Sequence, residues 1–225
     1  MCGRFAQQRP TAELAELFDA EPLVLDPGGR FNVAPTDEAA VVVERRDGRR
    51  AVAAYTWGLI PSWESDPRVA ARHINARAET VATSGTYRES FVRRRCIAPV
   101  DGFYEWRRDE AGRHPYLIRR SDGAPLALAG LWSGWHDPET DHVRRTFTIV
   151  TTEPNELIAP LHNRMPVVLD PRDRATWLDP NLREVGELHG LLRPAPIDGL
   201  DVYAVRPLVN NVRNNGPELI EQLGL

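Results

Sequence analysis

The chain has 225 residues, of which 42% are hydrophobic and 27% charged, and its formal net charge is −4. This composition is typical of a folded globular protein and excludes a disordered chain. No apolar run is long enough to span a membrane, so we expect no membrane partner. All 28 basic residues are arginine, so the chain's own N-terminus is its only amine able to form an imine with an aldehyde.

In chain order, the sequence predicts many short strands and a few helices. Residues 11–18 have the spacing of an amphipathic helix capped by Thr11. Residues 40–44 and 51–57 predict two strands around a turn at Asp47-Gly48, and residues 61–67 predict a loop. Further strands are predicted at 96–100, 116–119, 126–132, 147–151 and 202–205, and helices from Thr152, from Asp170 to Trp177 and over 217–223.

This order of elements predicts one α+β domain over residues 1–225, with curved, mostly antiparallel, barrel-like sheets and a few flanking helices. The N-terminus lacks the apolar core of a signal peptide, and two cysteines are too few for a disulfide framework. Six scattered histidines without a CxxC pair do not predict a zinc site. We therefore expect a cytoplasmic, monomeric protein without metal or cofactor, in which Cys96 is a core residue.

Cys2 directly follows Met1 and has a side chain small enough for methionine aminopeptidase to accept. Removal of Met1 would expose an amine next to a thiol. The α-amine has a reference pKa of about 8, and a thiolate is a strong nucleophile. Together they can capture an aldehyde, because the amine forms an imine and the sulfur then closes a thiazolidine ring. On position alone, a second residue without a chemical role is the simpler interpretation.

Seven motifs change that interpretation. They are MCGRF (1–5), RFNVAPT (30–36), WGLIPSW (57–63), NARAET (75–80), APVDGFYEW (98–106), LHNRMPVVL (161–169) and NNVRNNGPELI (210–220). In this order, over nearly the whole chain, they resemble the SRAP family, the SOS-response-associated peptidases or abasic site processing proteins. The resemblance implies a compact, mostly β fold, binding of single-stranded DNA, covalent capture of abasic sites by the N-terminal cysteine during the DNA damage response, and autoproteolytic peptidase activity.

The catalytic set that the resemblance implies is Cys2, Asn75, Glu105 and His162. Aromatic neighbours of Glu105 are expected to raise its pKa and make it a proton carrier; the alternative is an exposed strand carboxylate. His162 would help to open the cyclic sugar, and its alternative is a histidine at a helix end. Asn75 would orient the α-amine or a sugar hydroxyl, or would be an ordinary turn residue.

Because the net charge is negative, DNA binding must come from a local basic patch. Arg4, Arg77 and Arg164 each lie beside a proposed catalytic residue, and we predict that they clamp phosphate. Arg30 and Arg213 are weaker candidates. The remaining arginines, including the 93–95 run, are predicted to be solvated or salt-bridged.

Two further residues are predicted to contact DNA. Trp63, on its loop, would stack on a base or wedge the strands apart. Some members of the family carry a second aromatic residue after this tryptophan, whereas this chain has Glu64, which cannot stack and repels phosphate. Pro35 would contact the sugar–base edge or would be a simple turn proline.

The predicted partner is single-stranded DNA that contains abasic sites, with the protein at the nucleoid when bound. Two other functions remain open at this point. An N-terminal-nucleophile peptidase or amidase would turn over an amide substrate, and a non-catalytic reader of modified bases would bind DNA without needing Cys2 or Glu105.

Overall fold

The strands form two sheets in the computed structural model, which describes residues 2–24, 26, 28–110 and 112–224. They are β1 (Phe5–Gln7), β2 (Ala20–Pro22), β3 (Arg30–Val33), β4 (Glu38–Glu44), β5 (Arg50–Trp57), β6 (Asn75–Arg77), β7 (Arg95–Val100), β8 (Gly102–Asp109), β9 (Gly112–Arg120), β10 (Leu126–His136), β11 (Val143–Thr152), β12 (Met165–Pro166) and β13 (Leu200–Ala204). The smaller sheet has the order β13-β9-β8-β1-β3. The larger follows β12-β11-β10-β7-β4-β5-β2, with β6 paired to β11.

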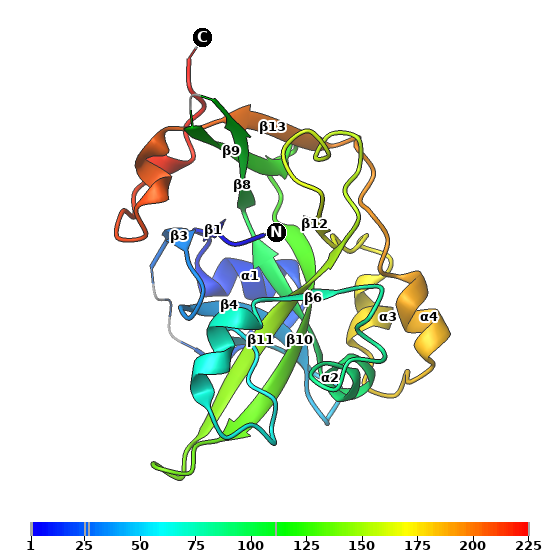
Figure 1. Ribbon diagram of the computed structural model, residues 1–225. Coiled ribbons are helices and arrows are strands. Elements are labelled where there is room, and N and C mark those ends of the chain that lie inside the picture. Colours follow the sequence, from blue (N-terminus) through cyan, green and yellow to red (C-terminus); the bar gives the residue numbers. More distant parts are fainter. Residues whose placement is uncertain (1, 25, 27, 111, 225) are drawn as a thin grey trace.

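The larger sheet closes on itself where β5 meets β11. These two strands pair in parallel at Thr56–Thr146 and Trp57–Phe147, while β4–β5, β4–β7, β7–β10 and β10–β11 are antiparallel. Figure 1 shows β8, β9 and β13 at one end of the molecule, and β10 and β11 extending to the other. The predicted α+β class with curved, mostly antiparallel, barrel-like sheets is confirmed.

Apolar runs in the sequence become strands that are buried on both faces. In β4, residues 39–43 are all buried, as expected where a sheet is covered on both sides. The predicted hairpin of β4 and β5 is confirmed, and Gly48 supplies the positive φ of 78° in its turn. The strands predicted at 96–100, 116–119, 126–132, 147–151 and 202–205 correspond to β7, β9, β10, β11 and β13.

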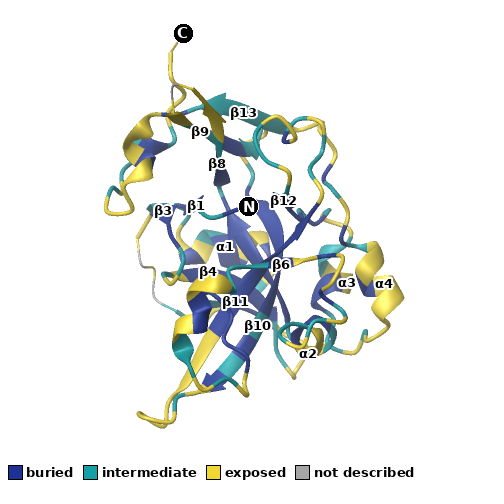
Figure 2. Ribbon diagram, viewed as in Figure 1, coloured by how far each residue is buried: buried dark blue, intermediate teal, exposed yellow. Residues whose placement is uncertain are grey.

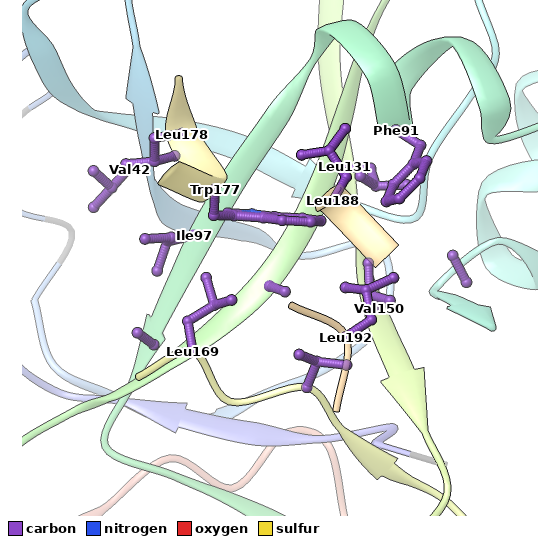
Figure 3. Close-up of a cluster of buried hydrophobic side chains, with 14 of the residues drawn as sticks. Val42, Phe91, Ile97, Leu131, Val150, Leu169, Trp177, Leu178, Leu188 and Leu192 are labelled. Carbon is purple, nitrogen blue, oxygen red and sulfur yellow. The ribbon is translucent and has the colours of Figure 1, made fainter. Parts of the chain in front are cut away.

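Helices cover the barrel and enclose a core around Trp177 (Figure 3). They are α1 (Thr11–Leu17), α2 (Arg88–Arg93), α3 (Arg174–Leu178) and α4 (Val185–Gly190), with 3₁₀-helices η1 (Pro67–Arg72), η2 (Pro207–Asn210) and η3 (Pro217–Leu219). The Trp177 indole is fully buried, and its Nε1 donates to the Cys96 carbonyl oxygen over 2.8 Å. Figure 2 shows the barrel strands buried, and α4 and the tip of the β10–β11 hairpin exposed.

The predicted helix from Thr152 is wrong. Thr152 ends β11, and the next residues form turns. The side chain of Asn155 accepts the backbone N–H of Ile158 over 3.0 Å, so the local capping geometry produces a tight turn instead of a helix.

Three other helix predictions need correction. Thr11 is the first helical residue of α1 and does not cap it, because Pro10 occupies the cap position. The helix predicted from Asp170 begins at Arg174, after a turn. The helix predicted over 217–223 is only the short 3₁₀-helix η3, because Leu223 donates its N–H to the carbonyl oxygen of Ala204, the last residue of β13.

Arg95 also differs from its prediction as a solvated or salt-bridged residue. It is 4% exposed, and its guanidinium donates to the carbonyl oxygens of residues 91, 92, 177, 179 and 182. It therefore ties α2 and α3 to β7 as a buried cation whose charge is offset by carbonyl dipoles.

No helix in the described part of the chain has both the length and the apolar composition needed to cross a membrane.

Candidate active site

The N-terminal segment is held against the barrel, and Cys2 is fully buried. Cys2 packs in the cluster that includes Phe5, Trp57 and Phe147. The Asn75 side-chain amide donates to the Cys2 carbonyl oxygen over 2.8 Å. Met1, whose removal was predicted, lies outside the described residues. The position of Cys2 is thus fixed on its carbonyl side by an amide from β6.

The Cys2 thiol is held in its protonated form. Burial raises the pKa of the Cys2 thiol, and the nearby charge of Glu105 raises it further. A protonated thiol is a poor nucleophile. Any reaction of this sulfur at neutral pH therefore needs a neighbouring group that accepts its proton.

Asn75 opens β6, which pairs in parallel with β11 beside Ile149. Its Oδ1 is buried and has no hydrogen-bond partner among the described residues. One end of the amide therefore orients Cys2, and the other presents an acceptor that a donor group of a substrate would satisfy. This position in a strand pairing rules out the alternative of an ordinary turn residue.

Glu105 lies on β8 and is 2% exposed, so the alternative of an exposed strand carboxylate is wrong. Its backbone pairs with Tyr116 of β9. Burial raises the pKa of Glu105 above its ordinary value. A carboxyl group with a raised pKa keeps its proton to a higher pH than an ordinary glutamate, which suits it to general acid–base catalysis.

His162 follows the turn that Asn155 organises, and its backbone N–H donates to the Ile158 carbonyl over 3.0 Å. The preceding residues 156–161 form turns and not a helix, so the alternative of a helix-end histidine is wrong. Its Nδ1 accepts the backbone N–H of Arg164 over 3.0 Å, so the neutral ring carries its proton on Nε2. Burial lowers the pKa of His162, which favours this neutral form at neutral pH.

A cavity of about 780 Å³ opens over this group of residues. Its lining is Gly3, Arg4, Glu105, Trp106, Arg107, Arg108, Arg113, Pro160, Leu161, His162, Asn163 and Asn210. The structure therefore brings together the four predicted catalytic residues, since Cys2 precedes Gly3 and Asn75 contacts Cys2. Sequence reasoning missed Trp106, Arg113 and Asn210 as lining residues, although Trp106 and Asn210 lie in the motifs GFYEW and NNVRNN.

Of the predicted phosphate clamp, only Arg4 lines the cavity. It donates to Asn32 Oδ1 over 2.6 Å and to the Val209 carbonyl over 2.9 Å. Arg164 forms two hydrogen bonds with Glu79, of 2.6 and 2.9 Å. Arg77 is exposed on β6. Arg4 and Arg164 are thus already engaged within the protein, whereas Arg77 extends into solvent.

The other predicted DNA contacts lie outside the cavity lining. Trp63 is 65% exposed in the loop before η1. Glu64 accepts the backbone N–H groups of Ser65 and Asp66 with its side chain. Pro35 lies half-buried in the turn after β3. The weaker candidate Arg30 is paired with Asp37 over 2.5 Å.

Among the described residues, no group of three or more His, Cys, Asp or Glu side chains is placed to hold a metal ion.

Comparison with known proteins gives one consistent result. Residues 1–212 match the model of the family described as SOS response associated peptidase (SRAP). The chain is 38% identical to the abasic site processing protein YoqW of Bacillus subtilis and 32% identical to YedK of Escherichia coli, in each case over 98% of this chain and 99% of the relative. A crystal structure of a protein from Bacteroides thetaiotaomicron superposes with a TM-score of 0.88 at 26% identity, covering 99% of this chain and all of that one.

Proposed function

The chain belongs to the SOS response associated peptidase (SRAP) family, and on that premise we propose that it captures abasic sites in single-stranded DNA as a covalent adduct of Cys2. The observation that carries the proposal is the arrangement around the cavity. Cys2 is oriented by Asn75, and Glu105 and His162 line the adjoining space together with arginines. The reaction requires Cys2 to be the first residue, so the proposal includes prior removal of Met1.

The reaction balances without a cofactor. The neutral α-amine of Cys2 adds to the C1′ aldehyde of the ring-opened sugar and forms a carbinolamine. Loss of the hydroxyl group as water gives an imine. The Cys2 sulfur then bonds to the same carbon, the C=N electron pair takes up a proton, and a thiazolidine ring results. The overall change is one new C–N bond, one new C–S bond and one released water.

Buried Glu105 supports the proton transfers of this sequence. In its protonated form it can donate to the departing hydroxyl group, and the resulting carboxylate can then accept the thiol proton as the ring closes. The second transfer removes the proton that the raised pKa keeps on the Cys2 thiol. The acceptor is the Glu105 carboxylate, whose charge already acts on this thiol.

His162 supports the opening of the sugar. Most abasic sugar is cyclic, and its ring oxygen must gain a proton when the ring opens. The C1′ hydroxyl group loses its proton in the same step, so the proton count is unchanged. A neutral imidazole with its proton on Nε2 can donate a hydrogen bond to the ring oxygen as negative charge develops there, and its Nδ1 is held by the Arg164 backbone.

The test is a denaturing gel of the protein with single-stranded DNA that carries one abasic site. We expect a heat-stable shifted band for the wild type and for Cys96→Ala, which alters the other cysteine, buried in β7. Cys2→Ala should give no such band. An equal band with Cys2→Ala would refute the proposal, and turnover of an amide without any adduct would favour the peptidase alternative.

A further inference from the structure

Of the arginines expected beside the catalytic residues only Arg4 lines the cavity, and the other cations in its lining were not expected there. Arg77 and Arg164 are absent from its lining, whereas Arg108 and Arg113 of the β8–β9 hairpin are present. Sequence position alone gave Arg108 no role beyond a solvated charge. The structure places it with Glu105 and His162 around one space.

Arg108 and Arg113 face each other directly across the hairpin, since they are paired in the β8–β9 register. Like charges in that arrangement destabilise a hairpin. Arg107 lies 3.7 Å from Asp109, and the positive charge of Arg113 also acts on the buried carboxyl group of Glu105, where it opposes the rise in pKa. An anion bound to the pair would relieve their repulsion.

Trp106 and Arg4 lie between the Arg108–Arg113 pair and the catalytic residues. The Arg113 guanidinium lies 5.1 Å from the centre of the Trp106 ring, and that of Arg4 lies 5.9 Å from it. The Trp106 indole is fixed by a 2.6 Å hydrogen bond to Asn210. The charge of Arg113 contributes to the lowered pKa of Arg4, after burial, and that of Arg108 contributes to the lowered pKa of His162. These groups are therefore close enough to act on the same ligand.

The anion most consistent with this position is a phosphodiester. Guanidinium groups bind phosphate oxygens bidentately, and a cavity of about 780 Å³ exceeds the needs of one sugar without a base. Resting on the proposed function, we propose that Arg108 and Arg113 bind the DNA phosphodiester next to the abasic sugar, and that Trp106 and Arg4 connect this site to the catalytic residues.

The experiment measures non-covalent binding in a Cys2→Ala background, with a single-stranded oligonucleotide that contains one tetrahydrofuran abasic analogue. Each phosphate contact to a single strand contributes about 0.7 to the slope of log K against log salt. Arg108→Ala/Arg113→Ala should therefore reduce that slope by about 0.7–1.4. Lysine at both positions should restore most of it, because a point charge still contacts phosphate.

The matched control is Arg46→Ala/Arg183→Ala, which removes two exposed arginines outside the cavity lining. We expect its slope to equal that of the parent protein. Two shorter oligonucleotides end at the lesion, one on its 5′ side and the other on its 3′ side. The difference in slope between the hairpin variant and the parent protein should disappear with only one of them, the one that lacks the bound phosphate. An unchanged slope in the hairpin variant, or an equal fall in the control, would overturn the proposal.

Failure of this inference is separable from failure of the proposed function. Crosslinking by wild-type protein depends on Cys2 and is scored on a denaturing gel, whereas the phosphate site is scored by the salt slope of a protein that cannot crosslink. A normal crosslink with an unchanged slope refutes only the phosphate site, and a reduced slope without any crosslink refutes only the covalent reaction.

Discussion

The Asn75 side chain gives the sharpest test of how the N-terminus is positioned. Its amide donates to the Cys2 carbonyl over 2.8 Å at a partly buried position. Asn75→Ala removes that donor and leaves the carbonyl of Cys2 without its partner. Loss of one partner from a buried polar group costs about 1–3 kcal/mol.

If this free energy is lost in holding Cys2 in its reactive position, it raises the activation barrier of crosslinking by the same amount. Crosslinking should then slow by about 5- to 150-fold, since 1.4 kcal/mol corresponds to a factor of ten. The assay is single-turnover crosslinking with DNA in saturating excess, so that binding is not rate-limiting. Asn75→Asp keeps the size of the side chain but loses the donor when ionised, and it should be comparably slow.

Asn181→Ala is the matched control, because Asn181 is exposed in the turn after α3 and lies outside the cavity lining. It should react at the wild-type rate. Thermal unfolding of each variant shows whether the barrel is intact. Folded Asn75→Ala protein that reacts within twofold of the wild type would refute the positioning role.

Three further substitutions test other parts of the structure. Glu105→Gln should slow crosslinking by roughly 10²–10⁴-fold, and it should remove the fall in rate that we expect as pH rises through the raised pKa of Glu105, measured as a pH–rate profile. Glu79→Gln should cost about 0.2–1 kcal/mol at pH 7, because its pair with Arg164 is partly exposed and screened. Arg164 lowers the pKa of Glu79, so this contribution is present above the unfolded-state pKa and is lost as pH falls through the folded-state value; chemical denaturation at pH 7 and in acid would detect the difference. Arg95→Met should cost at least about 3 kcal/mol on chemical denaturation, because several buried carbonyls lose a charged donor, and a loss below 1 kcal/mol would contradict that reading.

The sequence was sufficient for the strands whose apolar residues are continuous. Residues 96–100 and 147–151 are buried on both faces, and such runs have few other stable placements. The seven motifs also predicted residues that meet at the cavity. Cys2, Glu105 and His162 come from three motifs that are far apart in the chain.

Local signals failed where tertiary contacts decide the outcome. Thr152 and Pro154 have the composition of a helix start, but the Asn155 side chain closes a turn there. The run of arginines at 93–95 looks solvent-exposed, yet Arg95 finds buried carbonyls contributed by segments more than 80 residues away. Strand register, which the sequence does not specify, is what pairs Arg108 with Arg113.

An intact-mass spectrum of the product formed with abasic single-stranded DNA tests the central claim most directly. We expect the mass of the chain beginning at Cys2 plus the oligonucleotide minus one water, and no such species with Cys2→Ala. A product that retains Met1, or an adduct of the same kind formed by Cys2→Ala, would contradict capture by an N-terminal aminothiol.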